Sequence, residues 1–394
     1  MKRVALLGMV AFVLACGGGG ATGGDGGADD GAASDGGNTN RDGGPPSGAW
    51  VMGYYAGYES KLQPVDAIDW ANLTHVAVAF TIPKADGTLD EQLFLDPTSG
   101  PQLARDIIAA AHKNGRKAIA SVGGAGVHAG WVGAASAANR AKFAARLAKL
   151  LTDYGYDGID FDWEPIDPGD APALTDLVAQ VRALAPSATL TMPVGYVNTN
   201  QPDDLSLYKT LAANLDQINL MTYGMAGAYQ GWKSWHSSAL YQSDKAAPTS
   251  IDGSIQAYVA AGVPKKKLGV GAGFYGMCYT PPVSAPLQAL GGSQVVADDG
   301  KMSYAHIAAA YAPSARKWDS AAHVPYLSFG QASGPEGCGY VSYEDPQSLT
   351  DKGAYVKAQG LGGAIIWTIG QGYVASAPAA ERNPLTAALG AGIF

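Results

Sequence analysis

Short apolar segments alternate with helix-like segments along the chain from residue 50 onward. In one helix-like segment Phe143, Leu147, Leu150, Leu151 and Tyr154 follow the spacing of a single helical face. Eight other segments have the length and apolar content of buried strands, at residues 51–55, 75–80, 117–122, 158–162, 189–193, 217–221, 268–272 and 363–367. This alternation predicts an α/β fold, a closed parallel (β/α)8 TIM barrel. A doubly wound open sheet is the alternative, but no Gly-x-Gly-x-x-Gly follows the first strand to support a dinucleotide site.

The first 48 residues do not belong to the predicted barrel. Lys2 and Arg3 precede an apolar run at 4–15 that is too short to span a bilayer and is typical of an export signal. Cys16 follows directly, so residues 1–16 resemble a bacterial lipoprotein signal that places a lipid on Cys16; ordinary secretion is the alternative. Residues 17–48 are rich in Gly, Asp, Ala and Ser, and we expect a disordered tether there. The predicted location is the cell envelope or surface through this lipid, and otherwise the medium.

The gap between the last two predicted strands is too long for one helix. About 90 residues lie there, with a helix-like run at 305–310 and an apolar run at 324–329. We expect a small α+β insertion after strand 7, at about 276–340, within a catalytic domain at 49–394, and it would form a wall beside the mouth of the barrel. Cys278 and Cys338 lie near its two ends, and two cysteines in an exported domain most often pair. We therefore predict a disulfide, with a free buried pair as the alternative.

The charge pattern restricts the partners. The formal net charge is -8, and the only basic cluster is the short run at 265–267. A nucleic-acid partner is therefore not expected. We expect a monomer that contacts a membrane only through a lipid on Cys16.

Three carboxylates alternate with three apolar residues in the run at 157–164, Asp-Gly-Ile-Asp-Phe-Asp-Trp-Glu. On a strand Asp160, Asp162 and Glu164 share one face, because successive side chains point to opposite sides. Crowded and buried carboxylates hold protons near neutral pH, which predicts general-acid catalysis. A hard-cation site on the three acids is the alternative. An EF-hand loop is excluded because its third position would be Gly155, and the scattered histidines do not favour zinc, so neither a metal nor a cofactor is expected.

The ends of the other predicted strands carry aromatic residues. Chemistry in such barrels takes place at the carboxyl ends of the strands. An aromatic cleft around one acid is typical of a sugar site, because flat pyranose faces stack on aromatic rings. The candidate lining residues are Tyr54, Phe80, Gly124, Met221, Tyr223, Tyr275 and Trp367, with Trp232 and Trp235 on the loop after strand 6.

Four segments in order resemble the glycoside hydrolases of family 18, the chitinase family. They are Ser-Val-Gly-Gly at 121–124, the acidic run at 157–164, Ile-Asn-Leu-Met-Thr-Tyr at 218–223 and Gly-Gly-Ala-Ile-Ile-Trp at 362–367. The resemblance implies that Glu164 protonates the glycosidic oxygen while the substrate's own 2-acetamido oxygen attacks. It implies that Asp162 binds the acetamido N–H and that Asp160 shares a proton with Asp162. Tyr223 would hold the acetamido oxygen, and Trp367 would lie under the sugar that is cleaved.

The expected substrate is therefore chitin or an N-acetylglucosamine oligosaccharide, cut at its β-1,4 bonds. Trp232 and Trp235 are candidates for the leaving-group side, with packing inside the loop as the alternative. An endo-β-N-acetylglucosaminidase acting on N-glycans is one alternative, and a non-catalytic, lectin-like chitin-binding protein is the other.

Three positions depart from the family pattern. Gly224 stands where many relatives have Asp, and Met277 stands where many have Arg. Pro165 replaces the usual Tyr after the catalytic Glu, and since a cis bond is far less costly before Pro we predict a cis Glu164–Pro165 bond. The resemblance also implies cis bonds at Ala79–Phe80 and Trp367–Thr368.

Overall fold

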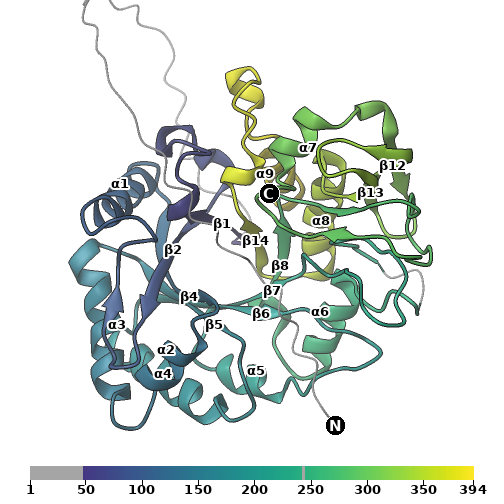
Figure 1. The fold of residues 1–394 in the computed structure, drawn as a ribbon. Coiled ribbons are helices and arrows are strands. Elements are labelled where there is room, and N and C mark those ends of the chain that lie inside the picture. Colours follow the sequence, from purple (N-terminus) through teal and green to yellow (C-terminus); the bar gives the residue numbers. More distant parts are fainter. Residues whose placement is uncertain (1–47, 242–244) are drawn as a thin grey trace, which may run out of the picture. The chain divides into compact units, whose positions relative to one another are not determined.

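The computed structural model describes residues 48–241 and 245–394. Within them eight parallel strands close into a barrel, and helices surround the ring of strands (Figure 1). The order around the ring is β1-β14-β8-β7-β6-β5-β4-β2, and pairing of β1 with β2 closes it. The predicted TIM barrel is thus confirmed. The predicted signal with Cys16, and the predicted tether up to residue 47, lie outside the described residues.

All eight predicted strands are present with small changes at their ends. They are β1 Trp50–Ala56, β2 His75–Pro83, β4 Lys117–Ala125, β5 Gly158–Glu164, β6 Thr189–Gly195, β7 Gln217–Met221, β8 Leu268–Gly273 and β14 Gly363–Trp367. One correction concerns β5, which extends two residues beyond the predicted end. Ala125 of β4 still pairs with Glu164, so this carboxylate is the last residue of the strand and does not lie past it.

The helices cover the outer face of the barrel. In α3 the predicted apolar face is present, because Phe143, Leu147 and Leu150 are buried. These side chains pack in the large hydrophobic core between strands and helices. The helices are α1 Ser99–Lys113, α2 His128–Ala134, α3 Arg140–Tyr154, α4 Ala171–Leu184, α5 Ser206–Leu211, α6 Ile251–Ala260, α7 Tyr304–Ala310, α8 Pro346–Gln359 and α9 Pro384–Ile393.

Short elements complete the described chain. Strand β3 (Leu89–Asp90) pairs antiparallel with the end of β2. Turns of 3-10 helix occur at Gly57–Glu59, Val65–Ala67, Trp70–Asn72, Lys265–Lys267, Pro313–Ala315, Gly370–Gly372 and Ala379–Glu381. Across the described parts of the chain no helix combines the length and the apolar character needed to cross a membrane.

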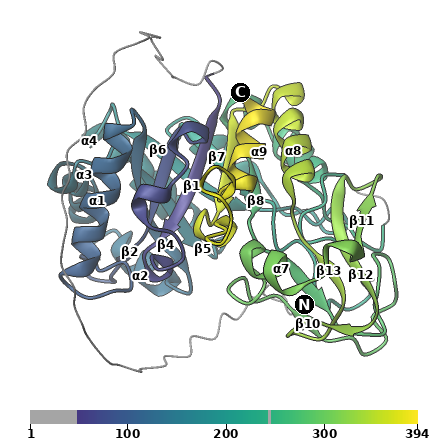
Figure 2. The same ribbon diagram turned by 90° about the horizontal axis from the view of Figure 1, so that it is seen from above.

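The predicted insertion is a second, antiparallel sheet between β8 and β14, and α7 lies within the same segment. Its strand order is β10-β9-β13-β12-β11, and it lies beside the barrel (Figure 2). The strands are β9 Met277–Tyr279, β10 Val295–Val296, β11 Arg316–Asp319, β12 Val324–Ser333 and β13 Cys338–Ser342. The predicted disulfide joins Cys278 and Cys338, which are both fully buried on the neighbouring strands β9 and β13.

Candidate active site

Strand β5 places its three carboxylates on one face, as the alternating sequence predicts. Ile159, Phe161 and Trp163 face the opposite way and are buried in the core under the helices. Asp160 and Asp162 are also buried, on the barrel side, whereas Glu164 at the mouth is half-buried. The acids therefore form a row that runs from the barrel interior to its carboxyl end.

Asp160 is the deepest of the three and is held by three hydroxyl groups. Its carboxylate accepts hydrogen bonds from Tyr54 (2.8 Å), Ser121 (2.9 Å) and Thr191 (2.5 Å). Burial raises the pKa of Asp160, while these three donors oppose the rise because they stabilise the charged form.

Asp162 and Glu164 are hydrogen-bonded to each other, which makes them a proton-sharing pair. Burial first, and then the charges of Glu164 and Asp160, raise the pKa of Asp162 well above its ordinary value. Burial also raises the pKa of Glu164. Asp162 thus carries the proton and donates a hydrogen bond to Glu164. Its other oxygen, Oδ1, is buried and accepts no hydrogen bond from the described residues.

Local backbone geometry brings the neighbouring strands close to this pair. Gly123 of β4 has a φ of 114°, and an added Cβ would lie 2.0 Å from the carbonyl oxygen of Asp162. Only glycine fits there, which explains the Gly-Gly in the segment 121–124. The bonds Ala79–Phe80, Glu164–Pro165 and Trp367–Thr368 are cis, so all three predicted cis bonds are confirmed.

Aromatic side chains form the wall around the acids. Trp367 stacks on Phe80 with 5.7 Å between ring centroids and lies 5.6 Å from Tyr54. Tyr223 and Tyr275 meet edge to face at 6.1 Å. Burial, followed by the charge of Tyr275 and of the three acids, raises the pKa of Tyr223 well above its ordinary value, so its hydroxyl stays protonated and is a donor.

The remaining lining candidates differ in position. Met221 ends β7 and is half-buried. The ring of Phe80 lies 3.1 Å from the place of a Cβ on Gly124, so this glycine leaves room for the ring. Tyr54 is almost fully buried, and its hydroxyl is committed to Asp160. Trp232 is half-buried and packs against Tyr229 at 4.8 Å between centroids.

One sequence prediction is wrong. Trp235 was a candidate for the leaving-group side of the cleft, but it is completely buried, as in the alternative of packing inside the loop. Its indole N–H donates to the carbonyl oxygen of Thr249, and its ring belongs to the hydrophobic cluster that joins the loop after β7 to the second sheet. The physical reason is that the apolar face of the second sheet packs against this loop, and the Trp235 ring is buried in that contact. The neighbouring His236 is a hydrogen-bonding residue, with Asp319 and Tyr340 as partners.

Two groups near the site were not identified from the sequence. Asp299, on the segment between β10 and α7, accepts the indole N–H of Trp367 at 2.9 Å. Tyr58 and Phe94 lie on loops after β1 and β3, are partly exposed, and meet edge to face at 5.7 Å. Asp298, Asp299 and Gly300 are typical of a turn, but nothing in the sequence indicated that Asp299 accepts a hydrogen bond from Trp367.

The two family positions that differ in this chain have clear structural settings. Gly224 has a left-handed φ of 61°, and an added Cβ would lie 3.3 Å from the Tyr275 hydroxyl. Met277 is buried in the cluster that contains Trp235. Neither position presents a charge to the acids of β5.

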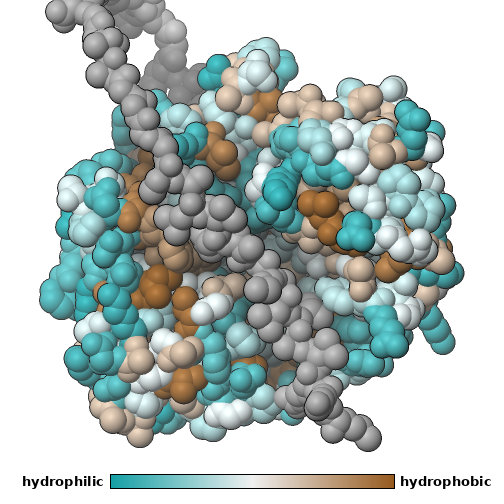
Figure 3. Space-filling model, viewed as in Figure 1, coloured by the Kyte–Doolittle hydropathy of each residue, from teal (hydrophilic) through white to brown (hydrophobic). Residues whose placement is uncertain are grey.

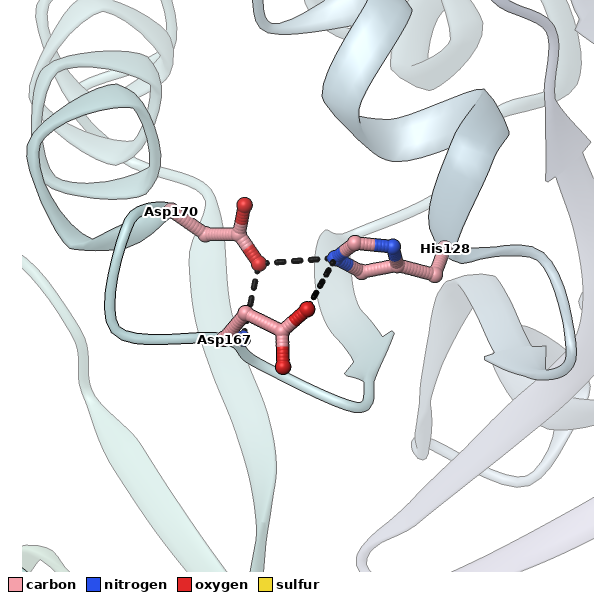
Figure 4. A group of neighbouring side chains, drawn as sticks. All are labelled: His128, Asp167 and Asp170. Carbon is pink, nitrogen blue, oxygen red and sulfur yellow. Dashed lines mark hydrogen bonds and ion pairs between the residues drawn. The ribbon is translucent and has the colours of Figure 1, made fainter. Parts of the chain in front are cut away.

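Beside the mouth of the barrel, His128, Asp167 and Asp170 form a group with the ligand types and proximity of a metal site (Figure 4). His128 Nε2 lies 2.8 Å from Asp170 Oδ2 and 3.7 Å from Asp167 Oδ2. The backbone N–H of Asp167 also donates to Asp170 Oδ2. The three residues therefore satisfy one another as an ion-pair cluster between the loops after β4 and β5.

On the face seen in Figure 3, patches of hydrophobic residues lie between hydrophilic ones, and hydrophilic residues are frequent at the rim. The site is thus a row of buried acids with one half-buried carboxylate, surrounded by aromatic rings. Such an arrangement suits protonation of a leaving group on a ligand that stacks on aromatic rings.

Comparison with known proteins gives the same picture. Chitinase 1 of Aphanocladium album is 28% identical over 344 residues, which cover 79% of this chain and 78% of that protein. Chitinase B of Serratia marcescens is 26% identical over 388 residues, which cover 79% of this chain and 75% of that protein. The crystal structure of Ostrinia furnacalis Group IV chitinase in complex with allosamidin shares the fold, with a TM-score of 0.71 at 24% identity over 86% of this chain and 97% of that one. The profile of the Glycosyl hydrolases family 18 matches residues 50–372, and the chain belongs to this family.

Proposed function

We propose that this enzyme hydrolyses β-1,4 bonds between N-acetylglucosamine units in chitin or chitooligosaccharides, with retention of configuration. The observation that carries the proposal is the pair of Asp162 and Glu164, in which Asp162 holds the proton and keeps one buried oxygen without a donor. A buried acceptor without a partner is costly, and an acetamido N–H of the substrate would satisfy it.

The positions of the residues support the following reaction. Glu164, at the mouth, gives a proton to the glycosidic oxygen as the bond to the leaving sugar breaks. The acetamido carbonyl oxygen of the same sugar forms the new bond at the anomeric carbon, and Tyr223 donates a hydrogen bond that holds this oxygen in place. Asp162 turns from Glu164 to the acetamido N–H, and its negative charge stabilises the cationic ring. The proton that Asp162 releases is the one that Glu164 gives to the glycosidic oxygen, and Asp160, which lies next to Asp162, shares a proton with it once the cycle is complete. Water, activated by Glu164, then attacks the anomeric carbon from the side that the leaving sugar occupied. This opens the ring that the acetamido oxygen had formed.

The lining residues supply the binding surface in this proposal. Trp367 is the floor under the cleaved sugar, and Phe80, Gly124, Met221 and Tyr275 border the same subsite. Tyr54 is proposed to act on Asp160 rather than on the sugar, because its hydroxyl is already engaged. Trp232 remains a candidate for the leaving-group side.

We also propose that residues 1–16 direct export and that Cys16 carries a lipid, with the barrel acting as a monomer. The signal pattern in the sequence supports this. Mass spectrometry of the mature protein tests it, since lipidation adds acyl mass to an N-terminal peptide that begins at Cys16. The variant Cys16→Ser would then appear in the soluble fraction.

Hydrolysis of chitotetraose and of a chromogenic chitobioside tests the proposed reaction, with the initial anomer followed by NMR. We expect the β-anomer first, and a loss of turnover on the order of 10²-fold or more in Glu164→Gln, since the general acid is removed. Glu381→Gln, an exposed carboxylate on the turn Ala379–Glu381, is the matched control and should keep full activity. Release of core N-glycans with no cleavage of chitotetraose would instead favour the endoglycosidase, and binding without cleavage would favour a lectin-like protein.

A further inference from the structure

The backbone on both sides of Tyr223 is attached to two consecutive serines of a later loop. The hydroxyl of Ser238 donates a hydrogen bond of 2.7 Å to the carbonyl oxygen of Thr222. The backbone N–H of Gly224 donates to the hydroxyl of Ser237 at 3.2 Å. Tyr223 therefore lies between two attachment points, and its position depends on how firmly Ser237 and Ser238 are held.

Ser238 is in turn held by a buried ammonium group. Lys352 of α8 donates from Nζ to both the carbonyl oxygen and the hydroxyl oxygen of Ser238, each at 2.8 Å. An ammonium has protons to give and no lone pair to offer, so it uses an acceptor position of the Ser238 hydroxyl. The single proton of that hydroxyl is then left for Thr222. In this way Lys352 decides the direction in which the Ser238 hydroxyl points.

The counter-charge of Lys352 lies in the segment that follows the second sheet. Glu344 forms an ion pair with Lys352, and the two side chains are 2% and 0% exposed. Ser348 donates to the other oxygen of Glu344 at 2.6 Å. The second sheet also reaches the serine loop directly, because the N–H of Ser237 donates to the hydroxyl of Ser342 at 2.7 Å.

A buried ion pair of this kind is weak evidence of stabilisation, because replacing both partners by apolar residues is often neutral or stabilising. What an apolar pair could not supply here is the donor that fixes the Ser238 hydroxyl. The geometry therefore gives Lys352 a task that packing alone does not.

We propose that Lys352, paired with Glu344, is a positioning residue for Tyr223 and acts through Ser238. This inference rests on the role of Tyr223 in the proposed function. The hydroxyl of Tyr223 must meet the acetamido oxygen at hydrogen-bond distance, and a displacement of about 1 Å in a reacting assembly costs on the order of 10²-fold in rate. The second sheet, through Glu344 and Ser342, thus contributes to the reaction as well as to the wall of the site.

A double-mutant cycle with the chromogenic chitobioside tests this. Ser238→Ala should lower kcat by about tenfold with KM nearly unchanged, because the attacking oxygen is less well held. In a Tyr223→Phe background the same change should have no further effect, since no hydroxyl remains to be positioned. Ser234→Ala is the matched control: Ser234 is buried on the same loop, but its hydroxyl donates to Ala285, away from Tyr223. It should lower the Tm to a similar extent and leave kcat unchanged.

A second variant covers the case in which the serine change acts through folding. Lys352→Met with Glu344→Leu removes both charges together and leaves no unpaired ion. It should stay folded and show the same loss of kcat, which again disappears in the Tyr223→Phe background.

Equal fold-losses in both backgrounds, with a lower Tm, would show a structural role only and would overturn the inference. If Tyr223→Phe is impaired and Ser238→Ala keeps full kcat, the inference fails while the proposed function stands. If Tyr223→Phe itself keeps the wild-type rate, the proposed role of Tyr223 fails, and the positioning fails with it.

Discussion

The indole N–H of Trp367 donates a hydrogen bond of 2.9 Å to Oδ2 of Asp299. Trp367 ends the last barrel strand, and Asp299 lies in the insertion, so the two parts of the domain meet at the floor of the site. Thr368, the residue after Trp367, is held by a second carboxylate. Its hydroxyl and the side-chain amide of Gln371 both donate to Glu59 on the loop after β1. The orientation of the Trp367 ring is thus set by groups from two distant loops.

Removing the acceptor on Asp299 should loosen this floor. We expect Asp299→Ala to lower kcat/KM for chitotetraose by about fivefold, which corresponds to one hydrogen bond of about 1 kcal/mol. Asp299→Asn keeps a carbonyl acceptor and should keep most of the activity. Asp298→Ala is the control, since among the described residues Asp298 has local turn contacts with Lys301 and Met302. Equal losses in Asp298→Ala and Asp299→Ala would point to the loop as a whole and contradict a specific role of the bond to Trp367.

The disulfide between Cys278 and Cys338 encloses a long segment, since the two residues are 60 apart in the sequence. Cross-linking a loop of this length stabilises the folded state by about 4 kcal/mol, mainly through the unfolded chain. We expect the double change Cys278→Ser with Cys338→Ser to lower the free energy of unfolding in urea by about this amount. Dithiothreitol should reduce the stability of the wild type to the level of the variant and leave the variant unchanged; a variant that still responds to the reductant would contradict the assignment.

The eight strands and the row of acids were predictable because their signals are local. Alternation in the run 157–164 depends only on the strand period of two, and it placed Asp160, Asp162 and Glu164 correctly on one face. The end of β5 was harder to predict from the sequence. It is set by pairing of Ala125 with Glu164, a contact between distant parts of the sequence.

The errors and omissions at the site share one cause. Trp235 was placed in the cleft because an aromatic residue on a loop after a barrel strand is a reasonable ligand-stacking candidate. Its actual place depends on how the second sheet packs against that loop. The partnership of Asp299 and Trp367 depends on the same packing, and no local pattern reports it. The sequence therefore predicts which elements form, but not which face of an irregular loop a separate sheet will cover.

An unusual backbone conformation at Leu93 and Phe94 exposes the side chain of Phe94. Leu93 and Phe94 have φ values of 52° and 59°, in the left-handed region that non-glycine residues seldom adopt, at a cost of about 1 kcal/mol or more each. The result is that Leu93 is buried, whereas Phe94 is 47% exposed and packs against the 37% exposed Tyr58. Both rings lie at the same end of the barrel as Glu164, and we expect them to contact sugars beyond the cleavage site.

We expect Phe94→Ser to lower kcat/KM for chitohexaose by about fivefold, the loss of one aromatic contact of about 1 kcal/mol, with no change for the chitobioside. A short substrate does not reach so far. Leu184→Ser is the control, because Leu184 is an apolar residue at the end of α4 that is exposed to a similar extent. A similar loss with both substrates would indicate damage to the site itself and would contradict a remote contact.

The raised pKa of Asp162 makes the stability of the fold depend on pH. In the unfolded chain Asp162 ionises near its ordinary value of 3.8, whereas in the folded protein burial and the neighbouring acids keep it protonated to much higher pH. Between these two pKa values the unfolded state releases a proton that the folded state retains, so the free energy of unfolding falls as pH rises above 3.8.

Asp162→Asn removes this pH-dependent loss of stability, since the amide does not ionise and its N–H can still donate to Glu164. We expect the variant to be inactive in hydrolysis but to have a higher Tm than the wild type at pH 7, with a difference that closes as pH falls towards 3.8. Asp96→Asn is a control of opposite sign. Hydrogen bonds from Ser99 and Thr98 lower the pKa of Asp96, so its charge stabilises the fold above pH 3.8 and the amide should reduce the Tm there. Thermal unfolding measured from about pH 2 to about pH 8, on both sides of the ordinary pKa of 3.8, distinguishes the two. A Tm gain in Asp162→Asn that stays constant at low pH would show that Asp162 destabilises the fold through packing and not through ionisation.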